Sequence, residues 1–398
     1  MKNFSIFILL FVFLFFASAQ SDSFYSAYGL GIPQYLISSQ SAGMGGAGIG
    51  VQQRLAYNSI NPAAVYLDGL TTISASYQGE IMDNTISGST VTTRQGNAAG
   101  FQFAFPMYKN RLAILASLKP LVKSQLTVDF TQETEDYTMV RTITNSGGLS
   151  AAAIGLNYAI LPGVFVGGLF NFNFGAYNET WKTEFDNETF LGGTDDISSH
   201  LWGAGAELGV LIKPLRFLSI GGVYKTSSEL NIETKIVSGG GNESAPVEQT
   251  ALYPTSLGLG VAFDFGKILI AGDFYSQLWD NYEVDGKKSE IMTNYIRTGA
   301  GIEFVGSREP LAAYYNRIAY RIGASYAQLP ILDVHGDAVT EMFVSGGLGF
   351  PFNKNAGRVD VAVEYGERRS TDAYPYSERL IRISASVTMA EKWFQQLY

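Results

Sequence analysis

The stretch NRIAYRIGASYA, residues 316–327, changes the character of its side chains at every second position. The apolar residues from Ile318 to Tyr326 share one face, and Arg317 and Arg321 share the other with alanine, glycine and serine. A period of two indicates a β-strand, because successive side chains of a strand point to opposite faces. A soluble sandwich would carry charges on its outer face, whereas the apolar face here carries the aromatic residues. The stretch therefore predicts a strand between lipid and a lumen.

Four other stretches alternate in the same way and place apolar side chains opposite small or charged ones. They are LWGAGAELGVLI (201–212), SLGLGVAF (256–263), VDVAVEYG (359–366) and LIRISASVTM (380–389). The pattern continues along the chain in spans at 70–81, 97–107, 110–130, 135–160, 163–185, 197–213, 216–238, 246–265, 267–282, 287–305, 316–329, 338–351, 357–368 and 379–393. This predicts an all-β fold, a transmembrane antiparallel β-barrel of about 14 strands.

The connections between these spans alternate in length, as in outer-membrane barrels with short periplasmic turns and longer outer loops. MYKN, LPG, KPLR and DFGK are short, whereas DNTISGSTVTTRQGN (83–97), DFTQETEDY, DNETFLGGTDD and VSGGGNESAP are long. The first hairpin loop is therefore expected to be long, and an even strand count places both termini in the periplasm. The connection GSREPLAAYY (306–315) is longer than a periplasmic turn should be.

The composition fits a barrel and excludes several other classes of protein. Charged residues make up 16% of the chain, against about 25% in soluble domains, and aromatic residues make up 13%. The net charge of −9 argues against nucleic acid as a partner. Because the chain contains no cysteine, it has no disulfide scaffold, thiolate metal site or cysteine nucleophile.

The first residues have the features of a secretory signal peptide. Lys2 precedes the apolar run 4–16 and the small residues 17–19, so cleavage is expected just before Gln20. The run is short of the roughly 20 residues that a spanning helix needs. The predicted organisation is a signal peptide, an N-terminal segment that fills the lumen, and the barrel, at 1–19, 20–69 and 70–398.

A glycine-rich stretch lies in that N-terminal segment. SAGMGGAGIGVQQRLAYNSINPAAV, residues 41–65, places five glycines within residues 43–50. A dinucleotide-binding loop would need a strand before it, a helix after it and an acidic residue about 20 residues on, and a P-loop would need a following lysine. The glycines instead suit tight turns in a compact coil inside a barrel.

The length of this segment, its glycines leading to Asn61-Pro62-Ala63 and the strand count together resemble the FadL-type outer-membrane transporters. That family carries long-chain fatty acids and other hydrophobic compounds and includes the TodX-like hydrocarbon channels. The resemblance implies a hatch inside the barrel, with hatch or gating roles for Gly43, Gly45, Gly46, Asn61, Pro62 and Ala63. The glycine-rich portion is also similar to PorV-like proteins, which share the barrel type and serve protein secretion.

The resemblance implies passive transport of hydrophobic small molecules, with long-chain fatty acids as the expected cargo and sideways release through a kinked third strand. A PorV-like secretion or binding component without small-molecule transport is the alternative. Either protein would lie in the bacterial outer membrane, and the expected partners are a hydrophobic ligand, outer-membrane lipid and lipopolysaccharide, and the barrel-assembly machinery. Pro120 lies in the third predicted strand, where a proline cannot donate to the ladder. It marks either the lateral opening or the point where that strand ends in a loop.

Four arginines on predicted lumen faces are candidate ligand-binding residues, namely Arg297, Arg317, Arg321 and Arg382. An arginine can hold a ligand carboxylate through paired hydrogen bonds. The predicted lumen also contains acidic residues, namely Glu207, Asp273, Glu303, Asp360 and Glu364. The arginines could therefore equally form a structural network that spans the lumen and pins the hatch.

Enzymatic activity is not expected, and neither is a metal or cofactor. His200 has Ser198 and Ser199 beside it, but a dyad between such close neighbours in sequence is unconvincing. His335 lies between Asp333 and Asp337, a set that suits a polar loop tip better than a metal site.

Overall fold

The computed structural model describes residues 23–35, 38–55, 60–86, 88–108, 111–187, 189–307, 309, 311–333, 335–353, 356–371 and 376–393. The predicted signal peptide lies outside these residues. Among the described residues, none of the helices has the length and apolar character needed to cross a membrane.

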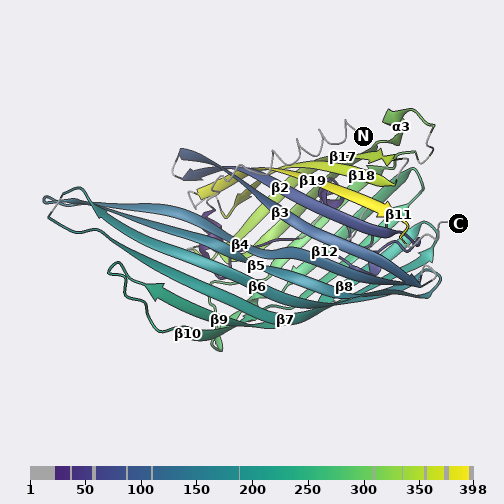
Figure 1. The fold of residues 1–398 in the computed structure, drawn as a ribbon. Coiled ribbons are helices and arrows are strands. Elements are labelled where there is room, and N and C mark those ends of the chain that lie inside the picture. The colour runs from purple at the N-terminus through teal and green to yellow at the C-terminus, as the bar shows by residue number, and fades with distance from the viewer. Residues whose placement is uncertain are drawn as a thin grey trace.

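Antiparallel strands close into a barrel, because the last strand pairs with the first strand of the wall along its whole length (Figure 1). Ten wall strands are continuous: β2 (Thr71–Ile86), β3 (Ser89–Tyr108), β4 (Leu112–Glu133), β5 (Thr138–Leu161), β6 (Val164–Phe185), β7 (Gly193–Leu215), β16 (Ala319–Leu332), β17 (Ala338–Phe352), β18 (Gly357–Arg369) and β19 (Tyr376–Glu391). Four are interrupted: β8 (Leu218–Lys225) with β9 (Ser228–Val237), β10 (Val247–Tyr253) with β11 (Ser256–Asp264), β12 (Ile268–Gln277) with β13 (Glu283–Val284), and β14 (Lys287–Lys288) with β15 (Tyr295–Phe304). Within the described residues the wall thus has 14 strands, which confirms the predicted fold class.

The two faces of the wall follow the predicted alternation. Leu259 and Ile322 point outward and are 66% and 61% exposed, as expected for side chains that meet lipid. Glu207, Asp273 and Asp360 point inward and are buried. The period of two therefore identifies the outward face and the lumen face of these strands correctly.

Two of the connections predicted to be long are short. Only residues 134–137 remain of the predicted loop DFTQETEDY, because β4 runs to Glu133 and β5 begins at Thr138. Residues 83–97 do not form a long loop, because β2 and β3 run to Ile86 and from Ser89 and leave only a tight turn. Threonine and valine favour extended backbone, and this hairpin lacks clear alternation because both of its faces are polar. The strand predicted to begin at residue 316 begins at Ala319, after the short helix α3 (Tyr314–Arg317).

The described residues before β2, residues 23–70, are called the N-terminal segment below. They include β1 (Ile32–Pro33) and the short helices η2 (Phe24–Ala27), α2 (Ser39–Ala42) and η3 (Pro62–Ala64); a further short helix, η4 (Trp279–Asn281), follows β12. The segment packs against glycines of the wall, on which an added Cβ would come within 2.7 Å of the segment's backbone: Gly167, Gly221, Gly260, Gly299, Gly301 and Gly323. Backbone therefore lies directly on backbone between the segment and the inner wall.

The wall is split between β3 and β4. Phe101 and Leu118 form the last pair of the two strands on one side of the split. Beyond this pair, the described residues of 89–100 and 119–133 form no backbone pairing across the split, and the two strands separate (Figure 1). A register shift beside Pro120 accounts for the separation, because a bulge bends the strand that carries it.

Candidate functional site

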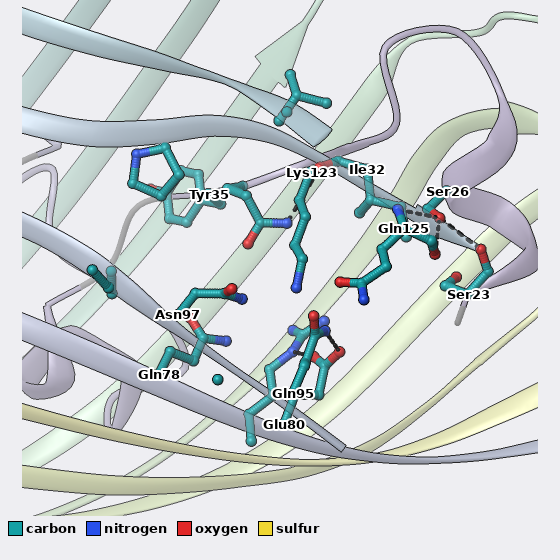
Figure 2. Close-up of a pocket in the computed structure, with 18 of the residues that line it drawn as sticks. Ser23, Ser26, Ile32, Tyr35, Gln78, Glu80, Gln95, Asn97, Lys123 and Gln125 are labelled. Atoms are coloured by element: carbon teal, nitrogen blue, oxygen red, sulfur yellow. Dashed lines mark hydrogen bonds and ion pairs between the residues drawn. The ribbon is translucent and has the colours of Figure 1, made fainter. Parts of the chain in front are cut away.

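A cavity of about 530 Å³ lies at this split. Residues 96–99 of β3 and 120–125 of β4 contribute to its lining, together with parts of β2, β5, β18 and β19 and of the N-terminal segment. Figure 2 shows the side chains of β2 and β3 opposite those of β4 across this space. The cavity thus lies where the wall is incomplete.

The N-terminal segment takes the place of β3 along the free edge of β4. Ile32 pairs with Lys123, and the amide of Gln34 donates to the carbonyl of Leu121 at 2.8 Å. Because β5 covers the other edge of β4 throughout, β1 occupies the edge that β3 leaves. Such an edge carries unpaired N–H and C=O groups, which another strand can satisfy.

The contact continues along β4 through Ser26. Its hydroxyl donates to the carbonyl of Gln125 at 2.6 Å and accepts from the amide of Gln125 at 3.0 Å. The Ser124 hydroxyl donates to the carbonyl of Ser26 at 2.7 Å. Residues 23–34 therefore close the split from the lumen along residues 121–125 of β4.

The cavity is lined mainly by polar side chains. Figure 2 shows the Lys123 side chain pointing into it between Asn97 and Gln125. Lys123 Nζ lies 2.9 Å from the Asn97 amide, oriented so that the amide oxygen accepts. The Glu80 carboxylate is fully engaged, because it accepts from Gln95 at 2.7 Å and from Arg382 at 2.6 Å.

Arg297 holds the glycine-rich turn. Its guanidinium donates to the carbonyl of Gly45 at 3.0 Å and lies 4.5 Å from the centre of the Tyr35 ring. Burial raises the pKa of the Tyr35 phenol, with Asp273 adding to the effect, so the ring stays neutral. Asp273 accepts from the amides of Gly48 and Ile49 at 2.6 and 2.7 Å. The glycine-rich turn therefore donates backbone N–H groups to the Asp273 carboxylate, and its Gly45 carbonyl accepts from the Arg297 guanidinium.

The other predicted arginines have three different surroundings. Arg321 is buried between Glu303 and Asp360, at 2.8 and 2.7 Å. Arg382 pairs with Glu80 and also lines the cavity. Arg317 lies in α3 before the strand begins, with its guanidinium 5.7 Å from the centre of the Tyr314 ring. The inward pairs have the form of the structural network that the sequence left open as an alternative.

The glycines and the Asn-Pro-Ala motif also lie in the N-terminal segment, against the wall. Gly43 caps α2, and Gly45 and Gly46 adopt positive φ angles of 65° and 77°, which favour glycine. Asn61 caps the start of η3 and donates to the carbonyls of Ile49 at 2.8 Å and Val210 at 3.1 Å. The next two residues of the motif are buried: Pro62, whose carbonyl accepts from Asn157 of β5, and Ala63, whose amide donates to the Asn61 side chain.

A family model described as BamG matches residues 1–397. The chain belongs to the BamG family. No curated protein sequence matches this BamG-family chain. Its fold is similar to that of the Ralstonia pickettii toluene transporter TbuX, with a TM-score of 0.59, 14% identity and coverage of 89% of this chain and 98% of the other. A Pseudomonas aeruginosa FadL homologue gives 0.63 and 12%, covering 91% and 99%, and the Pseudomonas putida toluene transporter TodX gives 0.57 and 15%, covering 91% and 100%. The barrel of this BamG-family chain is thus of the FadL/TodX type.

Only Pro120 and Arg382 of the residues selected from the sequence line the cavity. The possibility that the third strand ends at Pro120 is wrong, because β4 continues to Glu133. Two cavity residues, Lys123 and Asn97, were not predicted from the sequence. Before the bulge the buried residues of β4 have odd numbers, up to Lys119, and after it they have even numbers. One extra residue reverses the facing of all later side chains, so Lys123 lies on the face opposite to Val122 and Ser124. It borders the cavity because β4 has separated from β3 there, which the alternation of side chains does not predict.

The fit between segment and wall leads to a prediction for Gly323→Val. An added Cβ would lie 2.2 Å from the amide nitrogen of Gly45, so the segment must move away from β16. We expect proteases to cleave residues 39–51 in this variant of the folded barrel, whereas they leave these residues intact in the unaltered protein. Limited proteolysis with mass spectrometry measures this difference.

Gly272→Val provides a matched control, because Gly272 faces outward and its added Cβ would meet no atom closer than 3.7 Å. Valine is favourable in strands, so both variants make the same change in strand propensity. Identical cleavage of the two variants would contradict the close backbone fit. The shift in gel mobility on boiling confirms in each case that the barrel has formed.

Proposed function

We propose that this protein carries hydrophobic small molecules passively across a bacterial outer membrane, with long-chain fatty acids as the expected cargo and without catalysis. The observation that supports the proposal best is the split between β3 and β4, which lies at a cavity and is closed by residues 23–34. An apolar molecule has a lower free energy in lipid than in water. An opening in the wall would let it leave directly into lipid. The resemblance to FadL-type barrels and the similarity of the fold to the toluene transporters TbuX and TodX agree with this cargo class.

In this proposal the N-terminal segment acts as the hatch, and Pro120 marks the lateral opening. Residues 23–34 hold the edge of β4 through short hydrogen bonds that a small movement of the segment would break. The glycine-rich turn is fastened to Asp273 and Arg297 on the opposite side of the lumen. The first part of the segment can therefore leave β4 while the later part stays in place. Outer-membrane lipid and lipopolysaccharide surround the barrel, and the barrel-assembly machinery inserts it.

The test is binding and uptake of a fluorescent long-chain fatty acid. Purified protein in non-ionic detergent is expected to bind it saturably, and vesicles that contain the protein are expected to take it up faster than protein-free vesicles. Absence of both, together with co-purification of secreted proteins, would overturn transport and support the PorV-like alternative. The mobility shift on boiling verifies the barrel in the sample used.

A further inference from the structure

The charges that line the cavity are unevenly distributed. Three cationic side chains reach it, Lys123, Arg368 and Arg382, against the single carboxylate of Glu80. The two arginines have partners, because Arg368 pairs with Glu341 and Glu378 and Arg382 pairs with Glu80. Within the described residues no carboxylate oxygen lies within 4.0 Å of Lys123, which makes it the cation left over.

Lys119, on the same strand, shows how a buried ammonium group is normally stabilised, namely by an ion pair with a carboxylate. Lys119 lies 2.7 Å from the Glu207 carboxylate, and Lys225 approaches the same carboxylate at 3.4 Å. A charge taken from water needs such a partner, because burial removes its solvation. Among the described residues, Lys123 has only the neutral oxygen of Asn97 within hydrogen-bond distance. The Glu80 carboxylate attracts it from farther away but is already bonded to Gln95 and Arg382. An anion in the cavity would supply the partner that the protein does not.

Other groups around Lys123 could also donate to an anion. Tyr35 contributes to the lining, and its hydroxyl is buried without a hydrogen-bond partner among the described residues. The side-chain amides of Gln78 and Gln125 face the same space. Charge-assisted hydrogen bonds from such donors are about twice as strong as neutral ones.

The same cavity has apolar walls toward the split. Ile32, Val122 and Pro120 line it beside the polar groups. At the last pair of β3 and β4, Phe101 and Leu118 face outward and are 46% and 47% exposed. An apolar chain could therefore extend from the cavity through the split and along this surface into lipid.

We propose that the cavity is a binding site for amphiphiles with a single anionic head group, in which Lys123 holds the head and the split receives the apolar tail. This inference rests on the proposed transport function and narrows its cargo. It assigns the selectivity to Lys123 rather than to Arg297, Arg317 or Arg321, which lie outside the cavity lining. The head is recognised by its charge, so carboxylate and phosphate monoesters of long alkyl chains both qualify.

The experiment compares a long-chain fatty acid, its methyl ester and an alkyl phosphate of equal chain length, with the full-length protein in non-ionic detergent. We expect the acid and the phosphate to bind at least roughly tenfold more tightly than the ester, as one charged hydrogen bond allows. Lys123→Met is expected to remove this preference and leave the Kd of the ester unchanged. Lys123→Arg is expected to retain the preference.

Lys235→Met serves as the control, because Lys235 is a lysine with a 43% exposed side chain that pairs with Glu233 on β9 and does not line the cavity. It should bind all three probes as the unaltered protein does. Equal affinity of the unaltered protein for acid and ester, or an unchanged preference in Lys123→Met, would overturn this inference and leave transport of hydrophobic compounds intact. If none of the three probes binds, both the proposed function and this inference fail.

Discussion

A disulfide between Pro33→Cys and Val122→Cys is expected to reduce transport to the rate of protein-free vesicles, and reduction is expected to restore it. These residues are direct partners in the β1–β4 pairing, and antiparallel partners have Cα separations of about 4.5–5.5 Å, which a disulfide spans. The bond would hold β1 on the edge of β4 and keep the split closed. The chain has no cysteine of its own that could form a competing pair. Uptake of a fluorescent fatty acid, before and after reduction, measures the effect.

The matched control joins Ala262→Cys to Ala271→Cys, which are partners in the continuous part of the wall between β11 and β12. This disulfide fixes two strands that do not border the split, so uptake should not change. Full transport by the oxidised Pro33–Val122 protein would contradict a gate at this position. The reduced form of each variant shows whether the substitutions themselves disturb the protein.

Arg321→Met is expected to lower the free energy of unfolding by about 3–5 kcal/mol, the range for breaking a buried ion pair by removing one partner. Arg321 lies between Glu303 and Asp360, and all three side chains are at most 2% exposed. The substitution leaves two carboxylates in the lumen without this cation. Glu303 also accepts from Gln40 at 3.1 Å and from Gln53 at 3.2 Å, so the loss reaches the N-terminal segment. Urea unfolding in lipid vesicles measures the change.

Two further variants test the cause. Arg379→Met removes an exposed arginine from β19 and should change stability by no more than about 0.5 kcal/mol. Adding Glu303→Gln to Arg321→Met removes the carboxylate that has lost its ion-pair partner and should recover part of the lost stability, whereas Asp360 keeps its ion pair with Arg358 at 2.8 Å. Unchanged unfolding of Arg321→Met would show that the ion pairs contribute nothing to the fold.

The sequence predicts correctly which side chains of the wall point inward, because that depends only on the alternation of side chains along each strand. Glu207, Asp273 and Asp360 were placed in the lumen on that basis, and they are buried there. The hairpin at residues 83–97 escaped detection because a strand with two polar faces has no alternation to read. The prediction of a loop there overlooks that threonine favours extended backbone.

The contents of the lumen were less accessible to prediction. The pairing of Glu303 with Arg321 follows from neighbouring strands in register, but Asp360 joins them from β18, which requires the curvature of the wall. The contact of Arg297 with the carbonyl of Gly45 depends on the path of an irregular coil. Facing alone therefore proposed four arginines as ligand-binding residues, of which only Arg382 lines the cavity.

The glycines on the inner wall have a consequence for how this barrel can be altered. Gly299, Gly301 and Gly323 leave room only for bare backbone, and the coil that they receive presents Met44 and Gly45 by main-chain atoms. An N-terminal segment transplanted from another barrel would not fit the inner wall, because its backbone would follow a different path from the one these glycines accommodate. Chimaeras of these proteins will therefore need to exchange the coil together with the wall glycines, which makes two parts that are distant in sequence a single inherited unit.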